Sequence, residues 1–123
     1  MIKTNTKKVT IPSTIKKYGK TYKVTKINAS AFKGNKNIES VTIGSNVKSI
    51  GANAFANCTK VTSLNIKTAK LKSSSIGNGA FSCLGENNYY SLCVYLPKSK
   101  ETTYKNYLYE KGLSNQAKLI AGN

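Results

Sequence analysis

The sequence predicts an α/β fold in which short parallel strands and tight turns stack as coils of a right-handed solenoid. A motif of the form Ile-x-x-x-Ala-Phe occurs three times, beginning at Ile27, Ile50 and Ile76. Between the first two copies, other apolar residues also recur 23 residues apart, as Phe32 and Phe55 do. A period of this length is typical of proteins in which each repeat is one coil that buries its apolar edge only against its neighbours.

Each coil is expected to contribute one short strand to a parallel sheet. Four segments alternate apolar and polar residues with a period of two, as a strand with one buried face does. Parallel strands, about 4.8 Å apart, need a crossover between them. We expect each Ala-Phe segment to supply it as a tight turn or a short helical turn. A second extended stretch precedes the Ala-Phe segment in each coil. The four segments are Val9-Thr10-Ile11, Val41-Thr42-Ile43, Leu64-Asn65-Ile66 and Val94-Tyr95-Leu96, and the second stretches are 24–27 and 47–50.

The residues that recur in every coil are candidates for the core. A repeated aromatic residue could form a binding stripe, but repeats stabilise one another through identical buried side chains, which favours a core position. Cys58 takes the place that Asn35 has in the preceding coil, and a free cysteine behaves there as a small buried apolar residue. The predicted repeat core therefore comprises Ile27, Ile50, Ile76, Phe32, Phe55, Phe81 and Cys58.

Two insertions interrupt the repeat. The first coil has nine extra residues before Ile27, which predicts a β-hairpin at about 15–24 that turns at Tyr18-Gly19, where Gly19 can adopt a positive φ. The second insertion, at 67–75, is interpreted as a loop. The hairpin would either cover the first coil or expose the densest basic and aromatic cluster of the chain, and cations interleaved with aromatic rings can hold anionic or glycan ligands. This cluster is Lys16, Lys17, Tyr18, Lys20, Tyr22 and Lys23.

The chain changes character after its last repeat strand. Ser99 can cap a helix that runs to about Lys111, and Gly112 is suited to end it. Within this segment, apolar residues recur at helical spacing. We therefore expect residues 98–123 to form a helical cap that closes the open end of the solenoid, with a last short strand at 118–120.

The unit from Ile50 to Ile66 reads Ile-Gly-x-x-Ala-Phe-x-x-Cys-x-x-Val-x-x-Leu-x-Ile. This pattern resembles the BspA-type leucine-rich repeats of bacterial surface proteins over residues 9–97, and the tail from Leu96 is similar to the segment that closes many such arrays. The resemblance implies a leucine-rich-repeat solenoid. It also implies a protein outside the bacterial cell, at its surface or secreted, that adheres to host or neighbouring cells.

A length of 123 residues suits a single domain over 1–123. The first strand begins almost at the N-terminus without the polar cap that terminal repeats need. Residues 1–8 also lack the apolar stretch of a signal peptide. We therefore expect the chain to be a fragment of a longer surface protein.

All twenty basic residues are lysines, and against four glutamates they give a formal net charge of +16. Such a charge attracts anionic partners by raising encounter rate and local concentration, although solvation or a codon bias toward lysine would also explain it. Specific nucleic-acid binding is disfavoured because it depends heavily on the planar guanidinium of arginine. No apolar run is long enough to span a membrane.

The sequence offers few parts for catalysis. It has no His, Asp or Arg, no metal-ligand spacing and no glycine-rich phosphate loop, so we expect no catalytic residue, cofactor or metal. The odd cysteine count excludes a complete disulfide framework, although a bridge between Cys83 and Cys93 would be possible in an exported protein.

The predicted function is noncatalytic binding of a protein or a glycan, with a host or bacterial surface protein or an anionic glycan as partner. Solenoids commonly use the outward positions of the strand ladder for contact, and here these are Thr10, Thr42, Asn65 and Tyr95. Two alternatives remain open. The chain could be a spacer or terminal cap without a ligand of its own, or a lysine-rich electrostatic anchor to an anionic wall polymer or glycosaminoglycan.

Overall fold

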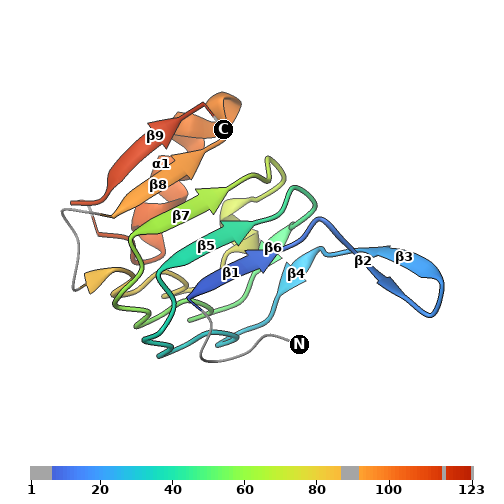
Figure 1. Ribbon diagram of the computed structural model, residues 1–123. Helices are drawn as coiled ribbons and strands as arrows, with labels where there is room; N and C mark the ends of the chain where they lie inside the picture. Colours follow the sequence, from blue (N-terminus) through green and yellow to red (C-terminus); the bar gives the residue numbers. More distant parts are fainter. Residues whose placement is uncertain (1–6, 87–91, 115, 123) are drawn as a thin grey trace.

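The computed structural model describes residues 7–86, 92–114 and 116–122, and it confirms the predicted α/β solenoid. Five short strands form one parallel sheet, with neighbouring strands paired residue for residue (Figure 1). Along each strand of the repeats, apolar side chains point into the core and the residues between them point outward. In sheet order the strands are β1 (Lys8–Ile11), β5 (Ser40–Ile43), β7 (Ser63–Ile66), β8 (Cys93–Leu96) and β9 (Lys118–Ala121).

A second, shorter ladder lies on another side of the coils. It contains β4 (Lys26–Ile27) and β6 (Ser49–Ile50), which pair in parallel, and a single bridge from Ile50 to Ile76 carries it into the next coil. These elements fall within the second extended stretches that the sequence predicts.

The Ala-Phe crossovers are tight turns and not the short helices that the sequence also allowed. Each contains two residues with positive φ at fixed places, one three residues after the repeat isoleucine and one two residues after the phenylalanine. The turn backbones also bond from coil to coil, since Phe32 N donates to Ala54 O at 2.8 Å and Phe55 N donates to Ala80 O at 2.9 Å. The positive-φ residues are Ser30, Asn53 and Gly79 at the first place, and Gly34, Asn57 and Cys83 at the second.

The core is a continuous column through the coils. The Phe32 and Phe55 rings stack with centroids 5.2 Å apart, and the Phe55 and Phe81 rings with centroids 5.9 Å apart. The Cys58 thiol donates a hydrogen bond to Phe32 O at 3.0 Å and so joins two coils. All seven residues of the predicted repeat core are buried, namely Ile27, Ile50, Ile76, Phe32, Phe55, Phe81 and Cys58.

The first insertion is a β-hairpin formed by β2 (Thr14–Lys17) and β3 (Lys20–Lys23). Tyr18 and Gly19 form its turn with φ of 54° and 77°, as a two-residue turn with the native strand twist requires. Figure 1 shows the hairpin projecting away from the coils, and every residue of its strands is exposed. The interpretation that the hairpin covers the first coil is therefore wrong.

The C-terminal cap consists of a 3-10 helix at Lys98–Lys100, the helix α1 (Glu101–Glu110) and the strand β9. The expected cap by Ser99 is wrong: this residue lies inside the 3-10 helix, and the residue that precedes α1, Lys100, makes no capping hydrogen bond with its side chain. Gly112 follows the helix with φ 106°. The short strand expected at 118–120 is present as β9, and it forms an edge of the sheet.

The second insertion, 67–75, is a loop with one 3-10 turn at Ser73–Ser75. It is fixed by a buried tyrosine of α1, because the Tyr104 hydroxyl donates to Thr68 O at 2.9 Å and accepts from Leu71 N at 3.1 Å. No helix in the described part of the chain has the length and apolar character needed to cross a bilayer.

Candidate ligand-binding surfaces

The outer face of the sheet carries two straight rows of side chains. Strand register places the four predicted stripe residues opposite one another, and Ile120 of β9 extends their row. The first row is Thr10, Thr42, Asn65, Tyr95 and Ile120, and the second row, which sequence reasoning missed, is Lys8, Ser40, Ser63, Cys93 and Lys118.

The first row has an unpaired acceptor at its centre. Asn65 Oδ1 is buried and has no hydrogen-bond partner among the described residues. A buried polar atom without a partner is uncommon in proteins, and it is costly unless a water or a ligand satisfies it. Neither row contains an acidic side chain. The sheet face is therefore a narrow strip without acidic side chains, with a lysine at each end of its second row.

The hairpin brings the six residues of the predicted basic and aromatic cluster together. Its register pairs Ile15 with Tyr22 and Lys17 with Lys20 on one face, so the other face carries Lys16, Lys23 and two threonines. At the tip, Lys17 Nζ lies 5.5 Å from the centre of the Tyr18 ring, and the Tyr18 side chain is 90% exposed. Cations are thus present on both faces, beside tyrosine rings that solvent reaches.

Positive charge is concentrated in the same part of the chain. Ten of the twenty lysines lie in the first 38 residues, which contain no acidic residue. The first glutamate is Glu39, and the other three follow in the last third of the sequence. The hairpin therefore belongs to the most cationic stretch of the sequence.

A small groove of about 220 Å³, with a mixed polar and apolar lining, lies at the base of the hairpin, where β1 and β5 end. Four hydroxyl-bearing residues and one lysine line it, together with Ile11, Pro12 and Gly44. A methyl group added at Gly44 would lie 2.5 Å from Ile11 O. The lining residues are Thr10, Ile11, Pro12, Ser13, Thr42, Gly44, Ser45 and Lys67.

The groove and the hairpin are joined rigidly at Ser13. Its carbonyl oxygen accepts from Val24 N at 3.0 Å, which closes the hairpin base, and from Asn46 Nδ2 at 2.9 Å, which attaches that base to the second coil. The Asn46 side chain is itself held by Lys70, whose Nζ donates to Asn46 Oδ1 at 3.1 Å. Sequence reasoning missed Asn46 because these contacts join residues 24 and 33 positions apart.

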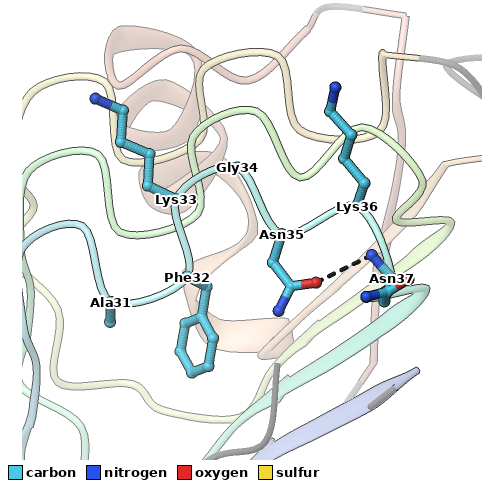
Figure 2. A pocket seen from close by; sticks show the side chains of 7 residues that line it. All are labelled: Ala31, Phe32, Lys33, Gly34, Asn35, Lys36 and Asn37. Carbon is cyan, nitrogen blue, oxygen red and sulfur yellow. Dashed lines mark hydrogen bonds between the residues drawn. The ribbon is translucent and has the colours of Figure 1, made fainter. Parts of the chain in front are cut away.

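A larger hollow, of about 430 Å³, lies along the turn of the first coil from Ala31 to Asn37. Figure 2 shows the Lys33 and Lys36 side chains extending to the opposite side from Phe32 and Asn35. Asn35 Oδ1 accepts from Asn37 N at 3.0 Å and is used in this local turn. No set of polar side chains converges here, so we assign this hollow no chemistry.

The cysteines are all free thiols. Burial raises the pKa of Cys58 from 9.0 to about 11, against the smaller opposing effect of a backbone hydrogen bond at Asn35. A hydrogen bond to the Glu86 carboxylate, together with burial and the charge of that carboxylate, raises the pKa of Cys83. Raised pKa values reduce the reactive thiolate, and the disulfide considered for Cys83 and Cys93 is not formed.

The chain matches a family model described as the BspA type leucine rich repeat region, in six copies over residues 2–115. The chain belongs to the BspA-type leucine-rich-repeat family. A similar solved structure is a leucine rich cell surface protein from Faecalibacterium prausnitzii A2-165, with 29% sequence identity and a TM-score of 0.55. The match covers 80% of this chain and 28% of the neighbour. No curated protein matches significantly.

For a BspA-type chain, the described residues hold little that suggests metal or acid–base chemistry. No group of three or more His, Cys, Asp or Glu side chains comes together among them. The features that do converge are the hairpin, the groove at its base and the sheet rows: Thr10 and Thr42 belong to both the groove and the first row, and Ser13 of the groove directly precedes β2. These exposed surfaces are the candidates for contact with a partner.

Proposed function

We propose that this BspA-type leucine-rich-repeat chain acts outside the bacterial cell as a noncatalytic adhesion module that binds an anionic protein or glycan of a host or neighbouring cell. The observation that carries the proposal is the exposed hairpin. Its strands bury no residue, yet it displays four lysines and two tyrosines in a region without acidic side chains. A projecting cationic arm raises the encounter rate with anionic partners and their local concentration.

Noncatalytic action is supported by the side chains available. The sequence contains no His or Asp, and its four glutamates are separated in sequence. General acid–base catalysis and nucleophile activation usually depend on such groups placed within hydrogen-bonding distance of one another. The family likeness to a cell surface protein supports the proposed location.

The test replaces the four hairpin lysines together by glutamine: Lys16, Lys17, Lys20 and Lys23. A matched control removes the same charge from exposed lysines elsewhere: Lys48, Lys60, Lys72 and Lys105. Binding to immobilised host matrix proteins, heparin and teichoic acid is measured at about 50 and 500 mM salt, where screening is weak and strong. We expect the hairpin variant to bind at least about tenfold more weakly than the control variant at low salt. Equal loss in both variants would mean that only net charge matters, and no binding by the wild type would favour a spacer or terminal cap.

A contact of the sheet face with a protein is the second candidate, supported by the unpaired Asn65 acceptor. Such a contact would persist at 500 mM salt because it does not depend on charge. We expect Asn65→Ala and Tyr95→Ala to weaken salt-resistant binding and the hairpin variant to leave it unchanged. Salt-resistant binding that survives both alanine substitutions would exclude the sheet face.

A further inference from the structure

We propose that the small groove at the base of the hairpin is a binding subsite for one acidic sugar residue, and that the polysaccharide continues from it along the hairpin. The inference rests on the proposed binding function and specifies the ligand as a carboxylated or sulfated polysaccharide. Nothing in the periodicity of the sequence indicates this site, because its residues come from three coils.

The first argument is the chemistry of the groove lining. Four of the eight lining residues bear a hydroxyl group, namely Thr10, Ser13, Thr42 and Ser45, and they lie beside Ile11, Pro12 and Gly44. Hydroxyl groups both donate and accept hydrogen bonds, as the hydroxyls of a sugar do. A volume of about 220 Å³ suits a single small polar group and is too small for a folded partner.

The second argument is charge. Lys67 is exposed at the rim and is the only charged side chain of the described groove lining. Its ammonium group is a compact positive charge with three N–H donors, and it can therefore pair with a carboxylate or a sulfate. This exposed ammonium is hydrated in the free protein, so a neutral sugar gains nothing from its charge, whereas an acidic sugar can form an ion pair with it.

The third argument is the way the groove continues into the hairpin. Ser13 lines the groove, and the next residue, Thr14, begins β2. With four residues at about 3.3 Å each, β2 extends about 13 Å to the tip. Lysines occur along this length on both faces, and the exposed Tyr18 and Tyr22 offer aromatic faces beside them. A repeating anionic chain fits such a track better than a single small anion does.

The fourth argument is that the site is already in place. The Ser13 carbonyl is held by Val24 and Asn46, and Gly44 approaches Ile11 closely within the lining. Thr10 and Thr42 are directly opposite each other in the parallel ladder. A preformed site avoids the free energy of ordering loops on binding.

The experiment compares four probes with the full chain: oligogalacturonate as a carboxylated polysaccharide, heparin fragments as a sulfated one, polyglutamate as an anionic polymer that is not a sugar, and dextran as a neutral one. Lys67→Gln tests the ammonium, with Lys105→Gln as the matched single-charge control. The double variant Thr10→Val/Thr42→Val removes hydroxyls at constant charge and similar volume. Thermal unfolding of each variant checks that the fold is kept.

We expect at least one acidic polysaccharide to bind, and its affinity to fall about three- to tenfold in Lys67→Gln and in the threonine variant but less than about twofold in Lys105→Gln. Oligogalacturonate or heparin, whichever binds more tightly, identifies the acidic group. Polyglutamate should bind more weakly and should not respond to the threonine variant. Dextran should not bind.

The proposal is overturned if polyglutamate binds as tightly as the acidic polysaccharides, or if Lys67→Gln behaves like Lys105→Gln. In either case, if the four-lysine hairpin variant still binds more weakly than its control, the proposed adhesion function is kept and is assigned to the hairpin without the groove. Absence of binding to any anionic probe or protein, with no difference between the hairpin variant and its control, would reject both.

Discussion

Gly51 lies against the backbone of Ala29 in the preceding coil, so closely that a methyl group on Gly51 would overlap the Ala29 amide nitrogen. Gly77 has the same relationship to Ala52 one coil later. The equivalent residue of the first coil, Asn28, is exposed. The residue after the repeat isoleucine is therefore glycine where a preceding coil packs against it, as at Gly51 and Gly77. It is asparagine at position 28, where the described residues include no preceding coil.

This relationship predicts the cost of a single methyl group. Gly51→Ala should lower the free energy of unfolding by about 1–3 kcal/mol, because the coils must separate to accommodate the new atom. Asn28→Ala should change it by less than about 0.5 kcal/mol, as exposed substitutions usually do. Urea unfolding of both variants gives the two values. Equal values would show that the two coils do not pack as closely as the structure indicates.

The phenylalanine column predicts different costs at its centre and its end. Phe55 is fully buried and stacks on a ring at each side, whereas Phe32 is 6% exposed and, among the residues that the structure describes, stacks on Phe55 alone. Phe55→Ala should therefore cost about 3–5 kcal/mol through the cavity it leaves. Phe32→Ala should cost less, since the end of a column can relax more freely. A larger cost for Phe32→Ala in urea unfolding would contradict this order.

The Tyr104 hydroxyl predicts a second measurable loss. Removing it in Tyr104→Phe leaves Thr68 O and Leu71 N without the partners that they have in the buried network. We expect a decrease of about 1–3 kcal/mol in the free energy of unfolding. The matched control is Tyr107→Phe on the same helix, a residue only partly buried against the core. If both variants lose the same stability, the hydroxyl of Tyr104 does not anchor the 67–75 loop.

The sequence predicted most of the fold because its repeat encodes contacts between neighbouring coils. A spacing of 23 residues places Phe32 beside Phe55, so the core and the strand ladder follow from one pattern. The Ser99 cap was wrong because Pro97 begins a 3-10 turn, and Ser99 lies within it. Local preference for a capping residue does not determine where the preceding turn ends.

The candidate site was less predictable, for two physical reasons. The length of the first insertion and its Tyr18-Gly19 turn predict a hairpin, but they do not indicate whether Ile15 and Tyr22 meet the core, and both are about half exposed. Lys67 and Ser13 line the same groove although they belong to different coils, a proximity that no local pattern encodes. The outward positions of a strand ladder can be predicted because the repeat sets the strand register. The positions of residues in an insertion cannot, because an insertion does not follow the repeat.

The buried thiol of Cys58 predicts a dependence of stability on pH. Its pKa is raised to about 11 in the folded chain from an ordinary value of 9.0, so folding favours the protonated thiol. This stabilising contribution is complete below about pH 9. It is lost as the pH rises through 11, because the unfolded chain releases the proton first. The free energy of unfolding should therefore fall by about 1.4 kcal/mol per pH unit between these values from this residue alone.

Lysine and tyrosine side chains also titrate in this range, so the comparison must be with Cys58→Ala. The variant is less stable at pH 8, but its free energy of unfolding should fall less steeply between pH 9 and 11, which urea unfolding at several pH values measures. Iodoacetamide labelling followed by mass spectrometry gives an independent check, since native Cys58 should stay unmodified at pH 8 and react once the chain is unfolded. Parallel slopes for the two proteins, or rapid labelling of native Cys58, would show that its thiol is not held protonated in the core.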